Sequence, residues 1–316
     1  MRIATESRQP VTWIGHGFRW YMPDAWQREQ EWMRDASRQG AQFFASARIQ
    51  PIDRKVVFKR TTFFNGLETW RDVFALAPQE RLAKLADPSL RPALRHAIDN
   101  PQRAATRGQI LPQIRWDALF VEQAMLPKNK ALEGRQAMKI AKERSIHVAD
   151  LLADMAVEEN LETVFRLHTA MPEDDIQRDR LLQGANVMVG NSDSGAHINS
   201  DCTAGEVTYF IKRYALDRKI ISLEEAVRRW TWMPASMAGF TDRGLLREGM
   251  AADIVVFSPS ELDVPPTEMA QDVPGGETRI VQKARGITHT IVNGRVALRG
   301  NRHTGERAGR VLRRRG

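Results

Sequence analysis

The sequence contains a single cysteine, Cys202, among its 316 residues. One thiol excludes an internal disulfide and any zinc cage built from several cysteines, and it is typical of a protein in a reducing compartment. No apolar run approaches the roughly 20 residues that a membrane-spanning helix needs. The opening residues 1–10 also lack the apolar middle region of a signal peptide. We therefore expect a cytoplasmic protein without a membrane partner.

Charge of one sign is in excess, with 47 Lys and Arg against 39 Asp and Glu and a formal net charge of +8. Part of this excess lies in the terminal stretch RVLRRRG, residues 310–316. Such a tail could contact nucleic acid, but no aromatic stacking pattern or nucleic-acid-binding motif accompanies it. We interpret it as a solvated terminus and expect no nucleic-acid partner.

The N-terminal part has the pattern of a strand, a helix and a second strand. Residues 9–15, QPVTWIG, are rich in β-branched and aromatic residues and predict a strand. Asp24 is the predicted N-cap of a helix, with Gln27 in the capping-box position and Gly40 at the end. The segment 41–51, AQFFASARIQP, predicts the second strand. This order is typical of a parallel sheet.

The middle of the chain predicts mainly helices. Residues 52–130 contain no clear strand, and only the segment around 88–100 has a helical pattern. Further elements are predicted from position 134 onward, by apolar periodicity and by turn residues. They are helices over 134–145, 148–156, 173–184 and 204–219 and from Ser222 and Pro234, a strand within 161–169, and a short buried strand at 186–190.

The C-terminal part has the pattern of a β-rich segment. DIVVFSP, residues 253–259, predicts a strand that is apolar on both faces. THTIVNGRVALRG, residues 288–300, predicts a hairpin because an Asn-Gly pair joins its two apolar runs. We therefore predict an α/β part over residues 1–240 and a small β-rich part over residues 241–316.

The stretch NVMVGNSDSGAH, residues 186–197, runs from an apolar strand directly into a polar cluster. In parallel α/β barrels the chemistry lies at the carboxyl ends of the strands. Asp193 follows such an end, and small neighbours such as Ser192 leave it accessible. An aspartate there can act as a general base or ligate a metal. The alternatives are an Asx turn at Asp193 and a structural role for His197.

Several segments together resemble one family of hydrolases. RGLLREGMAADIVVF (243–257) resembles the amidohydrolase superfamily signature that leads out of a barrel into a small β-sandwich, and 222–240 resembles the helices before it. DVPGG (272–276) and GITHTIVNG (286–294) look like the N-acyl-D-amino-acid deacylase branch, and SDSGAH (192–197) is similar to the end of its last barrel strand. The resemblance implies an α/β fold: a partial TIM-type metal-dependent hydrolase barrel with a C-terminal β-sandwich segment.

The resemblance also implies a reaction. Its substrate would be an N-acyl amino acid, and its cofactor would be zinc, which polarises the amide carbonyl. Asp193 matches the family's proton shuttle, which takes a proton from the attacking water and gives it to the departing amine; it is also a candidate metal ligand. Ser192, His197 and Arg48 are candidate substrate contacts. Arg48 could hold a substrate carboxylate with two hydrogen bonds, or it could form a structural ion pair.

The sequence departs from the family at the metal site. The family's site opens with a His-x-His pair, and no such pair occurs in these residues. His16, just past the first predicted strand, is a candidate ligand; the alternative is a structural histidine, since a zinc site needs three or more protein ligands. A second hypothesis is therefore that the chain is a catalytically incomplete C-terminal portion, truncated or half of a split enzyme. It would need an N-terminal polypeptide partner, and a homo-oligomer is the other assembly considered.

Overall fold

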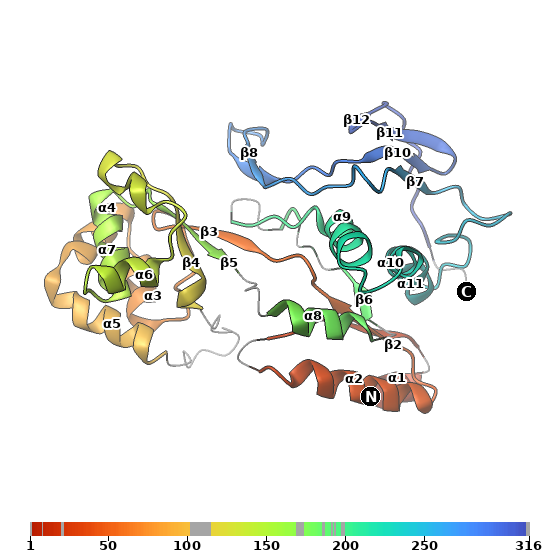
Figure 1. Ribbon diagram of the computed structural model, residues 1–316, viewed down its shortest axis with the longest axis horizontal. Helices are drawn as coiled ribbons and strands as arrows, with labels where there is room; N and C mark the ends of the chain where they lie inside the picture. The colour runs from red at the N-terminus through yellow and green to blue at the C-terminus, as the bar shows by residue number, and fades with distance from the viewer. Residues whose placement is uncertain are drawn as a thin grey trace. The chain divides into compact units, whose positions relative to one another are not determined.

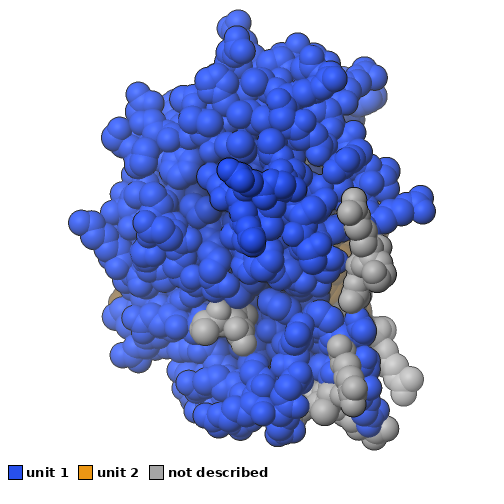
Figure 2. Space-filling model, turned by 90° about the vertical axis from the view of Figure 1, so that its right-hand side faces the viewer, with its two compact units in different colours: residues 1–51, 172–316 blue, residues 52–171 orange. Residues whose placement is uncertain are grey.

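The structure is a computed structural model that describes residues 2–7, 9–19, 22–101, 115–168, 174–184, 187–190, 192, 194–196 and 200–313. The chain forms two compact units, one of Met1–Pro51 with Pro172–Gly316 and one of Ile52–Met171. Figure 2 colours the first unit blue and the second orange. The sequence suggests a different division, near residue 240. That division stays a prediction. Within the described part, no helix has both the length and the hydropathy required to cross a membrane.

The first unit contains a parallel sheet of three strands in the order β1-β2-β6. Strand β1 (Val11–His16) is joined to β2 (Phe43–Ala47) by the helix α2 (Ala25–Arg38), and β6 (Val187–Val189) pairs with the other edge of β2 (Figure 1). The predicted strand–helix–strand unit is thus confirmed. The predicted capping box is wrong: Asp24 precedes α2, but its side chain accepts no capping hydrogen bond. The partial TIM-type barrel stays a prediction.

Helices of the first unit build its main apolar core. The side chains of Phe210 and Tyr214 are fully buried there together with Leu182 and Val187. One predicted helix is confirmed together with its cap, because the Ser222 Oγ accepts from the Glu225 N–H at 3.2 Å. The helices are α1 (Arg2–Ser7), α8 (Asp175–Leu182), α9 (Glu206–Phe210), which continues as a π-helix over Ile211–Asp217, α10 (Leu223–Trp230) and α11 (Trp232–Met237).

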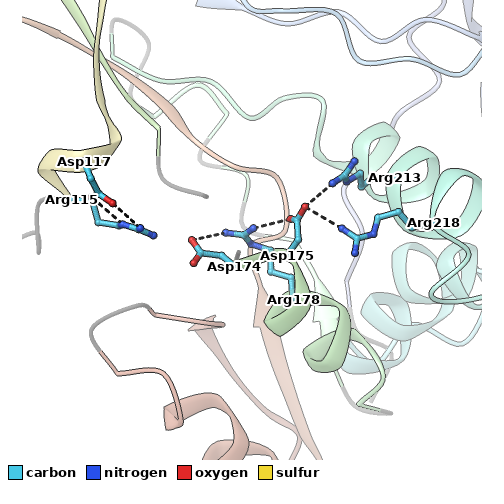
Figure 3. A network of polar contacts seen from close by, with 7 residues as sticks. All are labelled: Arg115, Asp117, Asp174, Asp175, Arg178, Arg213 and Arg218. Carbon is cyan, nitrogen blue, oxygen red and sulfur yellow. Dashed lines mark hydrogen bonds and ion pairs between the residues drawn. The ribbon is translucent and has the colours of Figure 1, made fainter. Parts of the chain in front are cut away.

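A charge network joins α8 to the π-helix (Figure 3). The carboxylate of Asp175 lies 2.6 Å from the Arg213 Nη2 and 3.1 Å from the Arg218 Nη1. Arg178, one turn along α8, donates to the other oxygen of Asp175 at 3.1 Å. Networks of several paired charges hold elements together better than isolated surface pairs do. The network therefore fixes α8, which leads into β6, against the π-helix.

Acid should weaken α10 through one carboxylate. Hydrogen bonds from Arg228 lower the pKa of Glu225 from 4.5 to about 2. Burial partly opposes this shift, and hydrogen bonds from Arg229 add to it. As the pH falls from 4.5 towards 2, the unfolded chain takes up a proton at this site before the folded chain does, so the free energy of unfolding falls. We expect Glu225→Gln to cost about 1 kcal/mol at pH 7 and to reduce this acid-dependent loss, measured by urea denaturation across the pH range. Exposed Glu248→Gln is the control; equal pH profiles for both variants would contradict the assignment.

The second unit is built on an antiparallel sheet in the order β3-β5-β4. Its strands are β3 (Asp53–Val57), β4 (Leu119–Gln123) and β5 (Val164–His168). The strand predicted within 161–169 is confirmed as β5, whereas the expectation of no strand in 52–130 is wrong. Aromatic side chains, among them Phe64 and Trp70 stacked with ring centroids 4.7 Å apart, fill the core under the sheet. The helices are α3 (Glu68–Phe74), α4 (Pro78–Ala86), α5 (Arg91–Asp99), α6 (Ala137–Glu143) and α7 (Val148–Glu158).

The C-terminal part of the first unit is an antiparallel sheet in the order β12-β11-β10-β7 with a separate pair β8-β9. The predicted hairpin is confirmed: Asn293 and Gly294 join β10 to β11 with φ of +48° and +79°, as a type I′ turn requires. The predicted strand is confirmed as β7, but its apolar residues are partly exposed, with Val255 53% and Val256 44% exposed. The strands are β7 (Ile254–Phe257), β8 (Glu268–Ala270), β9 (Arg279–Val281), β10 (Ile287–Val292), β11 (Arg295–Arg299) and β12 (Arg302–His303).

The glycine before β10 is required by a close approach of two backbones. Gly286 has φ +80°, and a Cβ there would lie 2.6 Å from the backbone N of Leu262 and the C of Glu261. We expect Gly286→Ala to lower the free energy of unfolding by about 2 kcal/mol, because a clash with backbone adds to the cost of the positive φ. Gly305→Ala is the control, since Gly305 has φ +92° but no atom within 4 Å. If urea denaturation showed the same loss of unfolding free energy in both variants, the steric explanation would be contradicted.

Candidate active site

The parallel sheet brings three of the predicted site segments to one edge. His16, Ala47 and Val189 are Cα partners across β1, β2 and β6, and each is the last residue of its strand. Arg48 therefore follows β2 at the same level at which Gly190 follows β6. Carboxyl ends of parallel strands are where α/β proteins hold their reacting groups. The register thus places His16, Arg48 and the start of the polar loop on the edge expected for a site.

His16 is held by a carboxylate on the helix that follows it. Its side chain is fully buried, and its Nδ1 lies 2.6 Å from the Oε2 of Glu29 on α2. Arg19 donates to the other oxygen of Glu29 at 3.2 Å and to the carbonyl oxygen of Gly15 at 2.5 Å. Glu29 is therefore fixed on both oxygens, by the ring of His16 and by a guanidinium anchored to β1.

The surroundings of His16 keep its ring neutral and leave one nitrogen unused. Burial lowers the pKa of His16 below its ordinary value of 6.5, and this outweighs the opposing effect of the hydrogen bond with Glu29. The Nε2 is buried and has no hydrogen-bond partner among the described residues. A neutral imidazole bound through one nitrogen to a carboxylate, with the other nitrogen unprotonated, is how metal-ligating histidines are usually held. His16 therefore fits the role of one metal ligand.

The polar loop after β6 is described only in part. Asp193 and His197 lie outside the described residues. Ser192 is described: its carbonyl oxygen accepts a hydrogen bond from the Thr203 hydroxyl, and its Oγ accepts one from the Ser194 N–H at 3.4 Å. The predicted strand before the loop is confirmed as β6. The start of the loop is thus tied to the segment that leads into α9.

The segment after β2 is joined to α9 by buried polar groups that the sequence did not single out. Glu206 is 1% exposed and accepts from the Ile49 N–H at 3.1 Å. Gln282 accepts from the Gln50 side chain at 2.9 Å and from the Gly205 N–H at 3.0 Å. The only sequence signal was Glu206 in the first turn of the helix predicted over residues 204–219. A glutamate at such a position is usually solvated. These contacts position the backbone beside Arg48.

Three further side chains differ in their placement. Arg48 is half-buried and already engaged in an interaction. His168 lies on β5 of the second unit, where its Nδ1 is 2.6 Å from Asp53, so it is not part of the parallel edge. Cys202 is a free, half-buried thiol. The described residues contain no group of three or more His, Cys, Asp or Glu side chains able to hold a metal ion, so of the predicted ligands they show His16 alone.

Comparisons with known proteins agree with the expected resemblance. Residues 152–298 match the model of the amidohydrolase family. The chain is 34% identical over 108 residues to the N-acyl-D-aspartate deacylase of Alcaligenes xylosoxydans xylosoxydans, covering 34% of this chain and 20% of that protein. It is 30% identical over 184 residues to the D-aminoacylase of the same organism, covering 57% of this chain and 34% of that protein. The expected resemblance to the deacylase branch is thus confirmed.

A solved structure agrees in fold. A D-aminoacylase structure that addresses the role of a binuclear metal centre matches with a TM-score of 0.51 at 21% identity, covering 98% of this chain and 51% of that one. At this identity the likeness concerns the fold alone. The matched segments span about a fifth to a third of the length of the two deacylases. The chain spans about half the length of the D-aminoacylase in the solved structure.

Proposed function

We propose, from the amidohydrolase-family match over residues 152–298, that this chain is a metal-dependent hydrolase of the amide bond in N-acyl-D-amino acids. The observation that carries the proposal is the common level at which β1, β2 and β6 end: His16 is in register with Ala47 and Val189, and Arg48 is the next residue after β2. The fold we propose around this edge is a TIM-type barrel portion over residues 1–240 and a β-sandwich segment over 241–316. We place the protein in the cytoplasm, where Cys202 stays reduced.

The proposed roles divide between the metal and the chain. Zinc, when bound, supplies a Lewis acid that polarises the amide carbonyl. His16 would hold the ion through its Nε2, which is the unused nitrogen of the ring. Asp193, which can also ligate, would take a proton from the attacking water and deliver it to the nitrogen of the departing amine, since amine expulsion needs that proton. This role rests on the resemblance.

The substrate would be oriented by groups beside this edge. Arg48 has the planar guanidinium that binds a carboxylate with two parallel hydrogen bonds, and every N-acyl amino acid carries such a carboxylate. Ser192 and His197 would contact the acyl amide from the loop after β6. Among the described residues, His16 is the single candidate ligand that the register places on this edge. The proposed zinc site therefore requires further ligands from residues outside the described ones.

Turnover of the purified chain tests this function. The chain would be loaded with zinc and given N-acetyl derivatives of D- and L-amino acids with acidic and with apolar side chains. We expect release of free amine from D-derivatives, abolished by a zinc chelator and restored by zinc. A folded, zinc-loaded chain that releases no amine from any of these substrates would overturn the proposal.

A second candidate function is that of a partner-dependent portion of such an enzyme, and exposed apolar edges favour it. Among the described strands β7 pairs only with β10, and it presents Val255, 53% exposed, without a charge or proline to protect its edge. Beside it lies a cavity of about 640 Å³ whose wall includes Leu245, Val227 and Trp230. Strand β1 is likewise an edge, with Ile14 71% exposed. A second polypeptide that supplies a strand would cover such surfaces.

Reconstitution separates the two candidates. The DNA beside the coding sequence would be translated, and the chain would be mixed with any polypeptide encoded there that carries a His-x-His pair. The second candidate predicts zinc-dependent turnover only in the mixture, together with slower hydrogen exchange at the β7 amides. Turnover by the chain alone, with no change of exchange at β7 in the mixture, would contradict it.

A further inference from the structure

The helix α2 carries a carboxylate at the edge of its buried face, where the side chain of Glu29 is 29% exposed. Its buried residues Trp26, Met33 and Ala36 follow the spacing of an apolar stripe that packs against the core. Glu29 lies three residues after Trp26 and four before Met33, so it occupies the same stripe. A carboxylate at such a position costs free energy unless it is paired and hydrogen-bonded.

Both oxygens of Glu29 are used, and in a fixed geometry. One lies 2.6 Å from the Nδ1 of His16, and the other accepts from Arg19 at 3.2 Å. Because Arg19 also donates to the carbonyl oxygen of Gly15, the guanidinium is anchored to the strand that carries His16. The carboxylate therefore cannot rotate away from the ring without breaking both contacts.

The protonation of the His16 ring follows from this geometry. An ionised carboxylate only accepts hydrogen bonds, so the neutral ring must carry its proton on Nδ1 to bond with Glu29. The lone pair then lies on Nε2, which is buried and without a partner among the described residues. A buried acceptor left without a partner is costly, and a ligand bound at Nε2 would remove that cost.

We infer that Glu29 is a positioning residue that holds His16 in the Nδ1–H tautomer and so keeps Nε2 available as a ligand atom. The inference rests on the proposed function where it concerns zinc, but the tautomer can be measured without metal. Arg19 supports it by fixing the second oxygen of Glu29. Removal of a carboxylate that hydrogen-bonds a metal-ligating histidine typically lowers the metal affinity by about 10- to 100-fold.

Nitrogen NMR of the metal-free full chain tests the inference. Imidazole ¹⁵N shifts, recorded at one neutral pH with the His16→Gln spectrum for assignment, should show a protonated Nδ1 and an unprotonated Nε2. Glu29→Gln should abolish this preference, because an amide can also donate to Nδ1 and so favour the other tautomer. Glu29→Asp, which keeps a carboxylate, should retain much of it. Glu31→Gln, an exposed change on the same helix, should leave the shifts unchanged.

Zinc binding by the same variants gives the second readout. We expect Glu29→Gln to weaken zinc binding, measured by chelator competition, by about 10- to 100-fold, and Glu31→Gln to leave it unchanged. An Nε2–H tautomer in the parent chain, or shifts and affinity unchanged in a folded Glu29→Gln, would overturn the inference. A parent chain with the Nδ1–H tautomer that binds no zinc would overturn the proposed function while supporting the role of Glu29.

Discussion

Replacing Asp193 by asparagine is expected to lower kcat for amide hydrolysis by roughly 10²- to 10⁴-fold, which is the contribution of general acid–base catalysis, because the amide can perform neither half of it. Asparagine keeps the size of aspartate, so the free energy of unfolding should change little. The measurement is the rate of amine release from an N-acetyl-D-amino acid at saturating substrate and zinc, accompanied by urea denaturation.

A neighbouring change controls for disturbance of the loop. Ser194 is exposed, and Ser194→Ala should keep the rate within about threefold of the parent chain, as expected for a surface position outside the chemistry. If Asp193→Asn kept more than a tenth of the parent rate, Asp193 would not be the proton shuttle. Parallel losses in both variants would indicate a structural effect on the loop instead.

Removing the guanidinium of Arg81 is expected to destabilise the second unit by about 3 kcal/mol. Arg81 is 7% exposed and donates to four backbone carbonyl oxygens, those of Phe58 at 2.5 Å, Lys59 at 3.0 Å, Phe74 at 2.8 Å and Leu76 at 2.9 Å. These carbonyls come from the turn after β3 and the end of α3. Arg81→Ala would leave buried acceptors without donors and a void beside the aromatic core.

Hydrogen exchange at the amides of α3 and α4 measures this effect within the second unit. We expect faster exchange there in Arg81→Ala and unchanged exchange in α2. Lys84→Ala, an exposed change on the same helix, should have no measurable effect. If Arg81→Ala matched Lys84→Ala, the four hydrogen bonds would contribute little, and the aromatic core alone would hold the unit together.

The elements that could be predicted are those whose pattern is local. The helix α2 places Trp26, Met33 and Ala36 on one face at spacings of seven and three residues, and the hairpin β10–β11 depends on two adjacent residues, Asn293 and Gly294. Both signals lie within a short window of sequence. Packing against distant segments then agrees with what the local pattern already favours.

The strands β3 and β4 could not be predicted because β3 begins with three charged residues, β4 contains Glu122, and their common partner β5 is distant in the sequence. Asp53 on β3 pairs with His168 and Arg166, and Glu122 on β4 pairs with Arg166 and Lys55. These pairs form a polar face that exists only when β5 lies between the two strands. No local pattern signals that arrangement, since it depends on cross-strand contacts between segments far apart in the chain.

The candidate site was likewise predicted only in its local parts. His16 stood out because a histidine follows a predicted strand, but its partner Glu29 was missed. A signal was present, since Glu29 interrupts the apolar stripe formed by Trp26 and Met33. The contacts of Gln282 with Gly205 and Gln50 carried no signal at all, because they join segments that meet only in the folded chain.

A zinc titration of the metal-free chain tests whether zinc held by His16 is required for amide hydrolysis. Amine release from an N-acetyl-D-amino acid would be followed as zinc is added in small steps below and above one equivalent. We expect the rate to rise from zero with added zinc and to reach a plateau when the zinc concentration nears that of the chain. We expect no such rise in His16→Gln. A folded chain that binds zinc and stays inactive at every step, or one whose rate does not depend on zinc or His16, would contradict this requirement.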